Sequence, residues 1–263
     1  MLIDFHTHCF PDKIADAAIN KLSFVSGGLT PYTNGTLSSL KGLMELQDVD
    51  ISVVLSIATN AHQQSSVNNF ARVINEDEKI VAFGSVFPDS PDALEELERI
   101  KDMGLKGVKL HPDYQGFFVD DEKMIPIYKK ISALGLITVF HAGFDYGFPP
   151  PYKATPDRMA KILKYFDTPV VAAHWGGANC GDDVLKYLAG RDIYFDTAFG
   201  YGQMPKYYAQ KIMEIHTPDK FLFGTDVPWH TADMERTLLG TLQLSAEDLE
   251  KITHKNAQML LGI

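Results

Sequence analysis

Short apolar runs rich in β-branched residues alternate with longer amphipathic stretches along most of the chain. Uninterrupted apolar runs are typical of strands buried on both faces, and apolar residues spaced three and four apart predict helices. The predicted strands are residues 2–5, 52–57, 80–86, 107–110, 136–140, 170–173, 193–195 and 221–224. The predicted helices are residues 38–49, 67–76, 92–103, 122–134, 156–166, 205–216 and 246–261.

This alternation predicts an α/β fold in which helices cover a parallel sheet. Eight such units in about 250 residues match a closed (β/α)8 TIM barrel. The alternative is an open, doubly wound sheet, which expects a G-x-G-x-x-G turn after the first strand, but this strand runs into His6-Thr7-His8. No repeat, low-complexity tract or linker divides the sequence, so we expect residues 1–263 to form one domain.

Two connections are candidates for covers over the carboxyl end of the barrel. Residues 26–36 are a cluster of Ser, Gly, Thr, Pro and Asn, so we interpret residues 23–36 either as a lid loop or as a plain surface excursion. Residues 144–152 are rich in aromatic residues and proline, and we expect them to form a stiff apolar wall.

Composition and charge narrow the class of protein. The 24 Lys and Arg residues against 34 Asp and Glu give a formal charge of -10, which disfavours nucleic acid and anionic membranes as partners. Two cysteines are too few for a disulfide framework, so we expect a cytoplasmic protein. The first residues resemble no signal peptide, and no run reaches the roughly 18 apolar residues of a membrane helix. We expect a small-molecule substrate as the partner and leave a homo-oligomer open.

Polar side chains gather where the predicted strands end, which is where the catalytic groups of a barrel converge. They are His6, His8, Lys109, His111, His141, His174 and Asp226. Any one of these histidines alone would be interpreted as a surface residue or a satisfied core residue. His6, His8, His141 and His174 alone are four of the nine histidines and lie at the ends of three strands, which is hard to attribute to chance.

The spacing of His6 and His8 suits a metal ion. Residues i and i+2 of an extended segment point to the same side, so both imidazoles can face one ion. Imidazole and carboxylate together suit Zn²⁺, with Mn²⁺, Fe²⁺ or Co²⁺ as alternatives. Three ring nitrogens and one carboxylate leave room for a bound water, whose pKa the ion would lower towards about 7.

These motifs carry a resemblance to a known family. The segment from Asp4 to Asp12 resembles the opening D-x-H-x-H-x-x-x-P of the amidohydrolase superfamily, with its proline, Pro11, one residue earlier, in the branch of aminocarboxymuconate semialdehyde decarboxylase-like proteins. Gly-Val-Lys-Leu-His-Pro at 107–112, His-Ala-Gly at 141–143, Ala-His-Trp-Gly-Gly at 173–177 and Phe-Gly-Thr-Asp-Val-Pro at 223–228 match that branch in order. The resemblance implies a metal-dependent, distorted TIM barrel.

The resemblance also implies roles for individual residues. His6, His8, His141 and Asp226 would be metal ligands, and Asp226 would also take a proton from the bound water. His174 would contact that water or the substrate in a site with one ion, and would bind the second ion in a site with two. Lys109 lies near the position of a bridging carboxylated lysine or acid, or is a cationic substrate contact.

The residues beside these positions extend the predicted site. His111 would point the same way as Lys109 along an extended strand, which favours a Lys–His contact for a substrate oxygen and a single working ion. We assign Trp175 to the wall of the substrate pocket, with packing as the alternative. Asp196 either orients a ligand or faces solvent. His230 lies in a loop on the same face and could bind substrate, and Cys9 is interpreted as a packing residue.

The sequence therefore predicts a metal-dependent hydrolase of a small amide, ester or lactone that uses a metal-activated water. The alternative is a non-oxidative decarboxylase of a small aromatic or unsaturated carboxylic acid, because the ligand set is shared. Few cations lie near the strand ends, which disfavours polyanionic substrates and tilts the prediction towards hydrolysis. A barrel that binds a small molecule without catalysis is the third interpretation.

Overall fold

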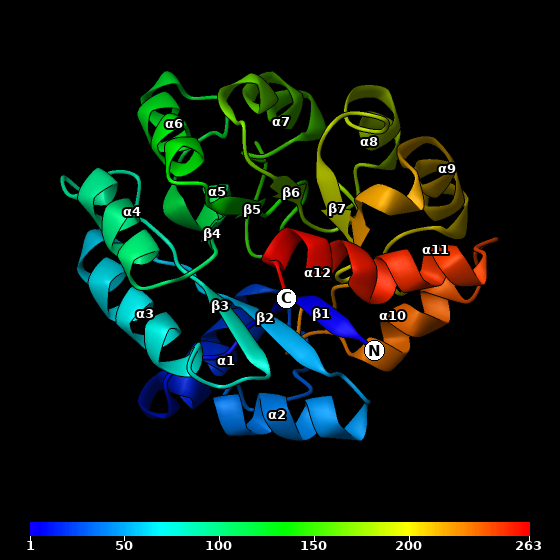
Figure 1. The fold of residues 1–263 in the computed structure, drawn as a ribbon, viewed down its shortest axis with the longest axis horizontal. Coiled ribbons are helices and arrows are strands. Elements are labelled where there is room, and N and C mark those ends of the chain that lie inside the picture. Colours follow the sequence, from blue (N-terminus) through cyan, green and yellow to red (C-terminus); the bar gives the residue numbers. More distant parts are fainter.

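Eight parallel strands surround a common axis in the computed structural model, which describes all 263 residues (Figure 1). The strands are β1 (Ile3–Thr7), β2 (Ile51–Leu55), β3 (Ile80–Phe83), β4 (Gly107–Leu110), β5 (Ile137–Phe140), β6 (Val170–Ala172), β7 (Tyr194–Asp196) and β8 (Phe221–Leu222). Every strand overlaps a predicted one. The buried apolar runs were therefore sufficient to locate the sheet.

The sheet closes on itself through two seams. Strands β1–β2–β3 form one ladder and β4–β5–β6–β7–β8 the other. Parallel bridges join the ladders, one between Gly84 and Val108 and one between Thr7 and Val227. At the second seam, the Asp226 N–H donates to the His6 carbonyl oxygen at 2.8 Å. The predicted (β/α)8 barrel is confirmed.

Helices cover the outside of the barrel (Figure 1). They are α1 (Asp12–Val25), α2 (Leu37–Leu46), α3 (Ala61–Ile74), α4 (Ala93–Asp102), α5 (Pro112–Gln115), α6 (Ile125–Ala133), α7 (Pro156–Ile162), α8 (Gly181–Tyr187), α9 (Lys206–His216), α10 (Ala232–Leu239), α11 (Ala246–Glu250) and α12 (Asn256–Leu261). The sequence does not predict α1, α5, α8 and α10. Helix α5 is a single turn, α1 and α8 bury few residues, and one of the residues that α10 buries is the charged Glu235. None of the helices combines the length and the apolarity needed to span a membrane.

The C-terminal stretch closes the amino end of the barrel. The predicted helix at 246–261 is divided by a wider π-helical turn over Lys251–Lys255. The Ile252 carbonyl in this turn accepts a hydrogen bond from the Phe223 N–H at 2.8 Å. Ala257 and Leu261 of α12 belong to the same buried cluster as the inward-facing strand residues, and α12 lies across the barrel near the N-terminus (Figure 1).

Both candidate covers lie at the opposite, carboxyl end. Within residues 26–36, the Tyr32 N–H donates to the Pro228 carbonyl at 2.7 Å, which ties this loop to the segment after β8. Residues 144–152 follow β5, and the backbone of Gly143 pairs with that of Ala178. The loop at 23–36 is thus placed beside the strand ends that carry the polar residues, and its action as a lid stays a prediction.

Gly107, the first residue of β4, offers a test of the packing. A Cβ there would lie 2.3 Å from the Phe83 ring and 2.6 Å from the Ile137 carbonyl oxygen. Gly107→Ala should therefore lower the free energy of unfolding by about 1–3 kcal/mol, as overpacking does. Gly42→Ala is the matched control, because a Cβ at Gly42 in α2 meets nothing within 4 Å; it should raise stability by about 0.5–1 kcal/mol. Urea titrations of both variants measure the difference, and equal stability would contradict the packing described.

Candidate metal centre

His6, His8 and Asp226 bring one atom each to a common point at the carboxyl end of the barrel. His6 lies in β1, His8 follows it directly, and Asp226 follows β8 across the second seam. Oδ1 of Asp226 lies 3.0 Å from His8 Nε2 and 3.3 Å from His6 Nε2. The three atoms all lie within 4.8 Å of one another, as ligands of one ion would. Closure of the barrel therefore joins residues that are 218 positions apart.

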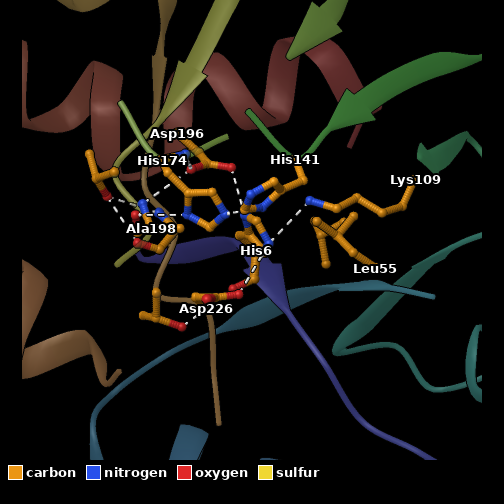
Figure 2. Close-up of polar contacts among 12 residues, drawn as sticks. His6, Leu55, Lys109, His141, His174, Asp196, Ala198 and Asp226 are labelled. Carbon is orange, nitrogen blue, oxygen red and sulfur yellow. Dashed lines mark hydrogen bonds and ion pairs between the residues drawn. The ribbon is translucent and has the colours of Figure 1, made fainter. Parts of the chain in front are cut away.

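The hydrogen bonds at Nδ1 of His6 and His8 indicate which ring nitrogens of this group carry no proton. His6 Nδ1 lies 2.7 Å from Asp196 Oδ2, and His8 Nδ1 lies 2.8 Å from the Leu55 carbonyl oxygen (Figure 2). Both acceptors place the proton of a neutral imidazole on Nδ1, which leaves a lone pair on each Nε2. Two bare nitrogens and a carboxylate oxygen then face one another. A cation is the partner that this donor set fits, and imidazole with carboxylate suits a divalent transition ion.

Lys109, at the third position of β4, supplies a second charge beside this group. Its Nζ lies 3.3 Å from His6 Nε2 (Figure 2). The residue is 1% exposed. Burial lowers the pKa of Lys109 to about 8, although the charges of Asp196 and Asp226 oppose the shift. Burial and the Lys109 charge together lower the pKa of His6 well below its usual value. His6 is therefore held neutral, which is the form that binds a metal.

Asp226 stays ionised despite its burial. Burial alone would raise its pKa, but the neighbouring imidazoles of His8, His6 and His174 lower it by more and hold the pKa well below the usual range. Asp196 shows the opposite balance, because burial raises its pKa more than His174 and Lys109 lower it. The carboxylate nearest the common point is thus the more acidic of the two.

His174 and Asp226 both have a left-handed backbone, with φ of +59° and +71°. This conformation costs a residue other than glycine about 1–2 kcal/mol. Asp196 Oδ1 accepts from the His174 N–H at 2.7 Å, and the His6 carbonyl accepts from the Asp226 N–H at 2.8 Å. Buried hydrogen bonds hold the strained backbone in place, as is common at functional sites.

His141, the remaining ligand of the predicted set, lies between two groups of side chains. Its Nδ1 is 3.1 Å from His174 Nε2, and His174 Nδ1 is 3.2 Å from the Ala198 carbonyl (Figure 2). On its other side, His141 stacks on His111 with ring centroids 4.1 Å apart. Its Nε2 is buried and has no hydrogen-bond partner. The structure thus places His141 beside His6, His8 and Asp226 but does not bring it into their group.

Lys109 and His111 have different partners. Strand β4 ends at Leu110, and His111 caps α5, where its Nδ1 accepts from the Tyr114 N–H. Its Nε2 lies 3.2 Å from Asp145 Oδ2, whereas Lys109 Nζ lies 3.3 Å from His6 Nε2. A shared contact of Lys109 and His111 with one substrate oxygen stays a prediction.

Trp175 lies in the core, and its Nε1–H donates to the Thr197 carbonyl at 3.1 Å. Its side chain is almost completely buried, and its ring packs edge-on against Phe221. These contacts favour the alternative that Trp175 packs in the core over a place in the wall of the substrate pocket.

Two residues of this region have no signal in the sequence pattern. Asp145, within the segment interpreted as an apolar wall, forms a group with His111 and His141. Glu235 in α10 is fully buried and lies 2.6 Å from His230 Nδ1, and burial raises its pKa to about 7. Neither residue follows a predicted strand directly, and only the folded loops bring them to these histidines.

Comparison with known proteins identifies the relatives of this chain. The family model described as amidohydrolase matches residues 3–263. An uncharacterized TIM-barrel protein from Bordetella bronchiseptica is 19% identical, with a TM-score of 0.78 over 99% of this chain and 98% of that one. The 5-carboxyvanillate decarboxylase of Sphingomonas paucimobilis is 14% identical, with a TM-score of 0.75 over 100% and 99%. A dihydroxybenzoic acid decarboxylase from Polaromonas, solved with manganese and 2-nitroresorcinol, is 15% identical, with a TM-score of 0.71 over 99% and 96%.

At these identities the solved structures show a shared fold. Comparison with the curated proteins gives no match.

Removal of the imidazoles of His6 and His8 tests the metal centre. The His6→Ala, His8→Ala double variant should lose the tightly held divalent ion, because two of the three converging atoms are gone. The metal content after dialysis is measured by inductively coupled plasma mass spectrometry. His254→Ala is the control, since His254 lies in the C-terminal π-helical turn away from the site. Wild-type metal content in the double variant would show that the ion binds elsewhere.

Proposed function

The chain belongs to the amidohydrolase family, and we propose that it is a metal-dependent decarboxylase of a small aromatic or unsaturated carboxylic acid. The supporting observation is the pairing of the His6, His8 and Asp226 group with a buried lysine beside it. A divalent ion and an ammonium next to each other suit one carboxylate, which can bind both at once. Two of the solved structures with the same fold carry decarboxylase names, which supports this choice over hydrolysis.

The ion would be held by His6, His8 and Asp226, with His141 as the next available imidazole. When bound, it supplies positive charge that offsets the negative charge of the substrate. The donor set accepts Zn²⁺ or Mn²⁺, and the manganese in the Polaromonas relative supports the second. We retain a single ion as the working state, in which Lys109 is a free cation.

The protein side chains would then divide the reaction between them. Lys109 holds the substrate carboxylate, and Asp196 keeps His6 in the orientation that leaves its Nε2 free. The bond between the carboxylate carbon and the rest of the substrate breaks, CO₂ leaves, and the electron pair stays on the substrate carbon. A proton must replace CO₂ on that carbon. His174 is the residue that we assign to deliver it, because its ring lies beside both His6 and His141.

Hydrolysis of an amide, ester or lactone remains a second candidate, on one observation. Asp226 is an ionised carboxylate in contact with two imidazoles, so it can accept a proton from an attacking water. Hydrolysis would then use the same residues with His174 steadying the developing oxyanion. The two reactions differ in their products, which makes them separable by assay.

The products of the metal-loaded protein decide between the two reactions. A panel of hydroxylated aromatic acids, unsaturated acids, esters, lactones and amides should show CO₂ release from at least one acid. His174→Asn should lower turnover by about 10²–10⁴-fold, the usual contribution of proton transfer. Asp226→Asn should also lower turnover, because it removes a charged ligand of the ion. His174→Asn should keep most of the metal. Ester, lactone or amide cleavage without CO₂ release from any acid would reject the decarboxylase proposal in favour of hydrolysis.

Lys109→Met separates a substrate contact from a metal bridge. Methionine fills a similar buried space without charge, so the variant should keep its metal and raise KM for the acid substrate by about 10-fold or more. Lys101→Met, on the outer helix α4, is the matched control and should leave KM unchanged. Loss of half of the bound metal in Lys109→Met would instead identify Lys109 as a bridge between two ions.

A further inference from the structure

Glu235 in α10 is a buried carboxyl group that holds the loop after β7. Its side chain is 0% exposed. Its two oxygens accept from the Gly200 N–H at 3.1 and 3.2 Å and from the Tyr201 N–H at 3.1 and 3.3 Å. Successive backbone N–H groups that converge in this way form a concave site for an anion. Here the chain fills that site with a carboxyl group of its own.

His230 gives the same carboxyl group a third partner. Its Nδ1 lies 2.6 Å from Glu235 Oε1, and its ring stacks on Phe199 with centroids 4.1 Å apart. Phe199 has a left-handed backbone with φ of +57°, which is unfavourable for a residue other than glycine. Glu235 and His230 therefore hold residues 199–201 through both the backbone and a side chain.

The carbonyl group of Ala198, next to this held segment, contacts a histidine of the site. It lies 3.2 Å from His174 Nδ1 (Figure 2). A carbonyl oxygen can only accept, so His174 carries a proton on Nδ1, and Nε2 has a lone pair when the ring is neutral. This carbonyl belongs to the peptide that joins Ala198 to Phe199. A shift of residues 199–201 would therefore move the acceptor away from His174.

His174 in turn determines where His141 carries its proton. Burial, and next the charges of His111 and His174, lower the pKa of His141 well below its usual value, so the ring is neutral. His141 Nδ1 lies 3.1 Å from His174 Nε2. A lone pair on His174 Nε2 places the single proton of His141 on Nδ1 and leaves His141 Nε2 without one. This agrees with a buried Nε2 that has no hydrogen-bond partner.

We propose that Glu235 is a positioning residue that fixes the proton positions of two histidines beside the metal centre. By holding residues 199–201, it keeps the Ala198 carbonyl on His174, and this leaves a lone pair on His141 Nε2 for the ion. Glu235 acts only through the backbone of the loop. The inference deepens the proposed function and rests on it for the use of His141 and His174 at the metal centre.

NMR of the imidazole nitrogens in the full-length, metal-free protein tests the proposal. His174→Asn and His141→Asn assign the signals. At a pH above 7, where Glu235 is ionised, Nδ1 should carry the proton in both wild-type rings. Glu235→Gln leaves one acceptor oxygen instead of two, so both Nε2 signals should move towards the protonated range.

Zn²⁺ affinity gives a second measurement on the same variant. Glu235→Gln should lower it by about 10-fold or more, the usual effect of losing a residue that orients a metal ligand. Burial raises the pKa of Glu235 to about 7, so the uncharged carboxyl group is already accessible near neutral pH. We therefore expect the neutral amide of glutamine to be tolerated by the fold.

Tyr201→Pro removes one of the two N–H donors and leaves Glu235 in place. Residues 200–203 form a turn in which the Gln203 N–H donates to the Gly200 carbonyl at 3.0 Å and Gly202 has φ of +73°. Proline is favoured at the second position of such a turn, so the turn should be kept. The signals of His174 and His141 should change as in Glu235→Gln. Tyr201→Ala keeps the N–H and should leave both signals unchanged.

Glu96→Gln separates this outcome from a general loss of stability. Glu96 in α4 is also a buried carboxyl group, 4% exposed, and accepts from Asn68 at 2.6 Å. It should lower the thermal midpoint without changing the signals of His141 and His174.

The outcomes distinguish the positioning role from the proposed function. Wild-type signals in both Glu235→Gln and Tyr201→Pro would overturn the positioning role, and so would an equal change in Glu96→Gln. Changed signals with lowered Zn²⁺ affinity would support the whole inference. Changed signals with unchanged Zn²⁺ affinity would support the positioning of the two rings but remove His141 from the metal centre, which counts against the proposed function.

Discussion

The backbone hydrogen bonds between β8 and β1 are the constraint on which the site depends. The Asp226 N–H donates to the His6 carbonyl, so the bond that closes the barrel also fixes a carboxylate beside an imidazole. Parallel strands in a closed sheet all end at the same rim, and side chains from the two ends of the sequence meet there. The left-handed backbone at Asp226 is unfavourable by itself, and this hydrogen bond and the neighbouring backbone hydrogen bonds stabilise it.

Burial determines the roles of the two carboxyl groups at the carboxyl end of the barrel, Asp196 and Asp226. A carboxylate removed from water needs hydrogen bonds or opposite charge to stay ionised. Asp226 has two imidazoles, whereas Asp196 lies deeper and uses both oxygens to hold His6 and the His174 backbone. The deeper carboxylate orients the histidines, and the shallower one is left to meet ion or substrate. Asp196 and Asp226 therefore have different roles because they are buried to different depths.

The sequence predicted the strands and the gathering of polar residues at their ends, because both are local signals. A run such as Ile137–Phe140 consists of β-branched and aromatic residues, and His141 follows it directly. Helix α5 and the Asp145 contacts could not be predicted in this way. A single turn has no periodicity, and Asp145 reaches His111 through a loop whose path depends on the packing of its own aromatic residues. The change of direction after Leu110 likewise depends on the Gln115 side chain, which accepts from the His111 N–H.

Helix α12 has a consequence for the order of assembly during synthesis. Its Ala257 and Leu261 complete the cluster inside the barrel that also contains Ile3 and Phe5. Strand β1 emerges from the ribosome before its partner β8 and the helix beneath both, which come much later in the sequence. Strand β1 must therefore wait, unpaired on one edge, until β8 has been translated. A cell that makes this protein has to keep an apolar, histidine-bearing strand from other partners throughout that interval.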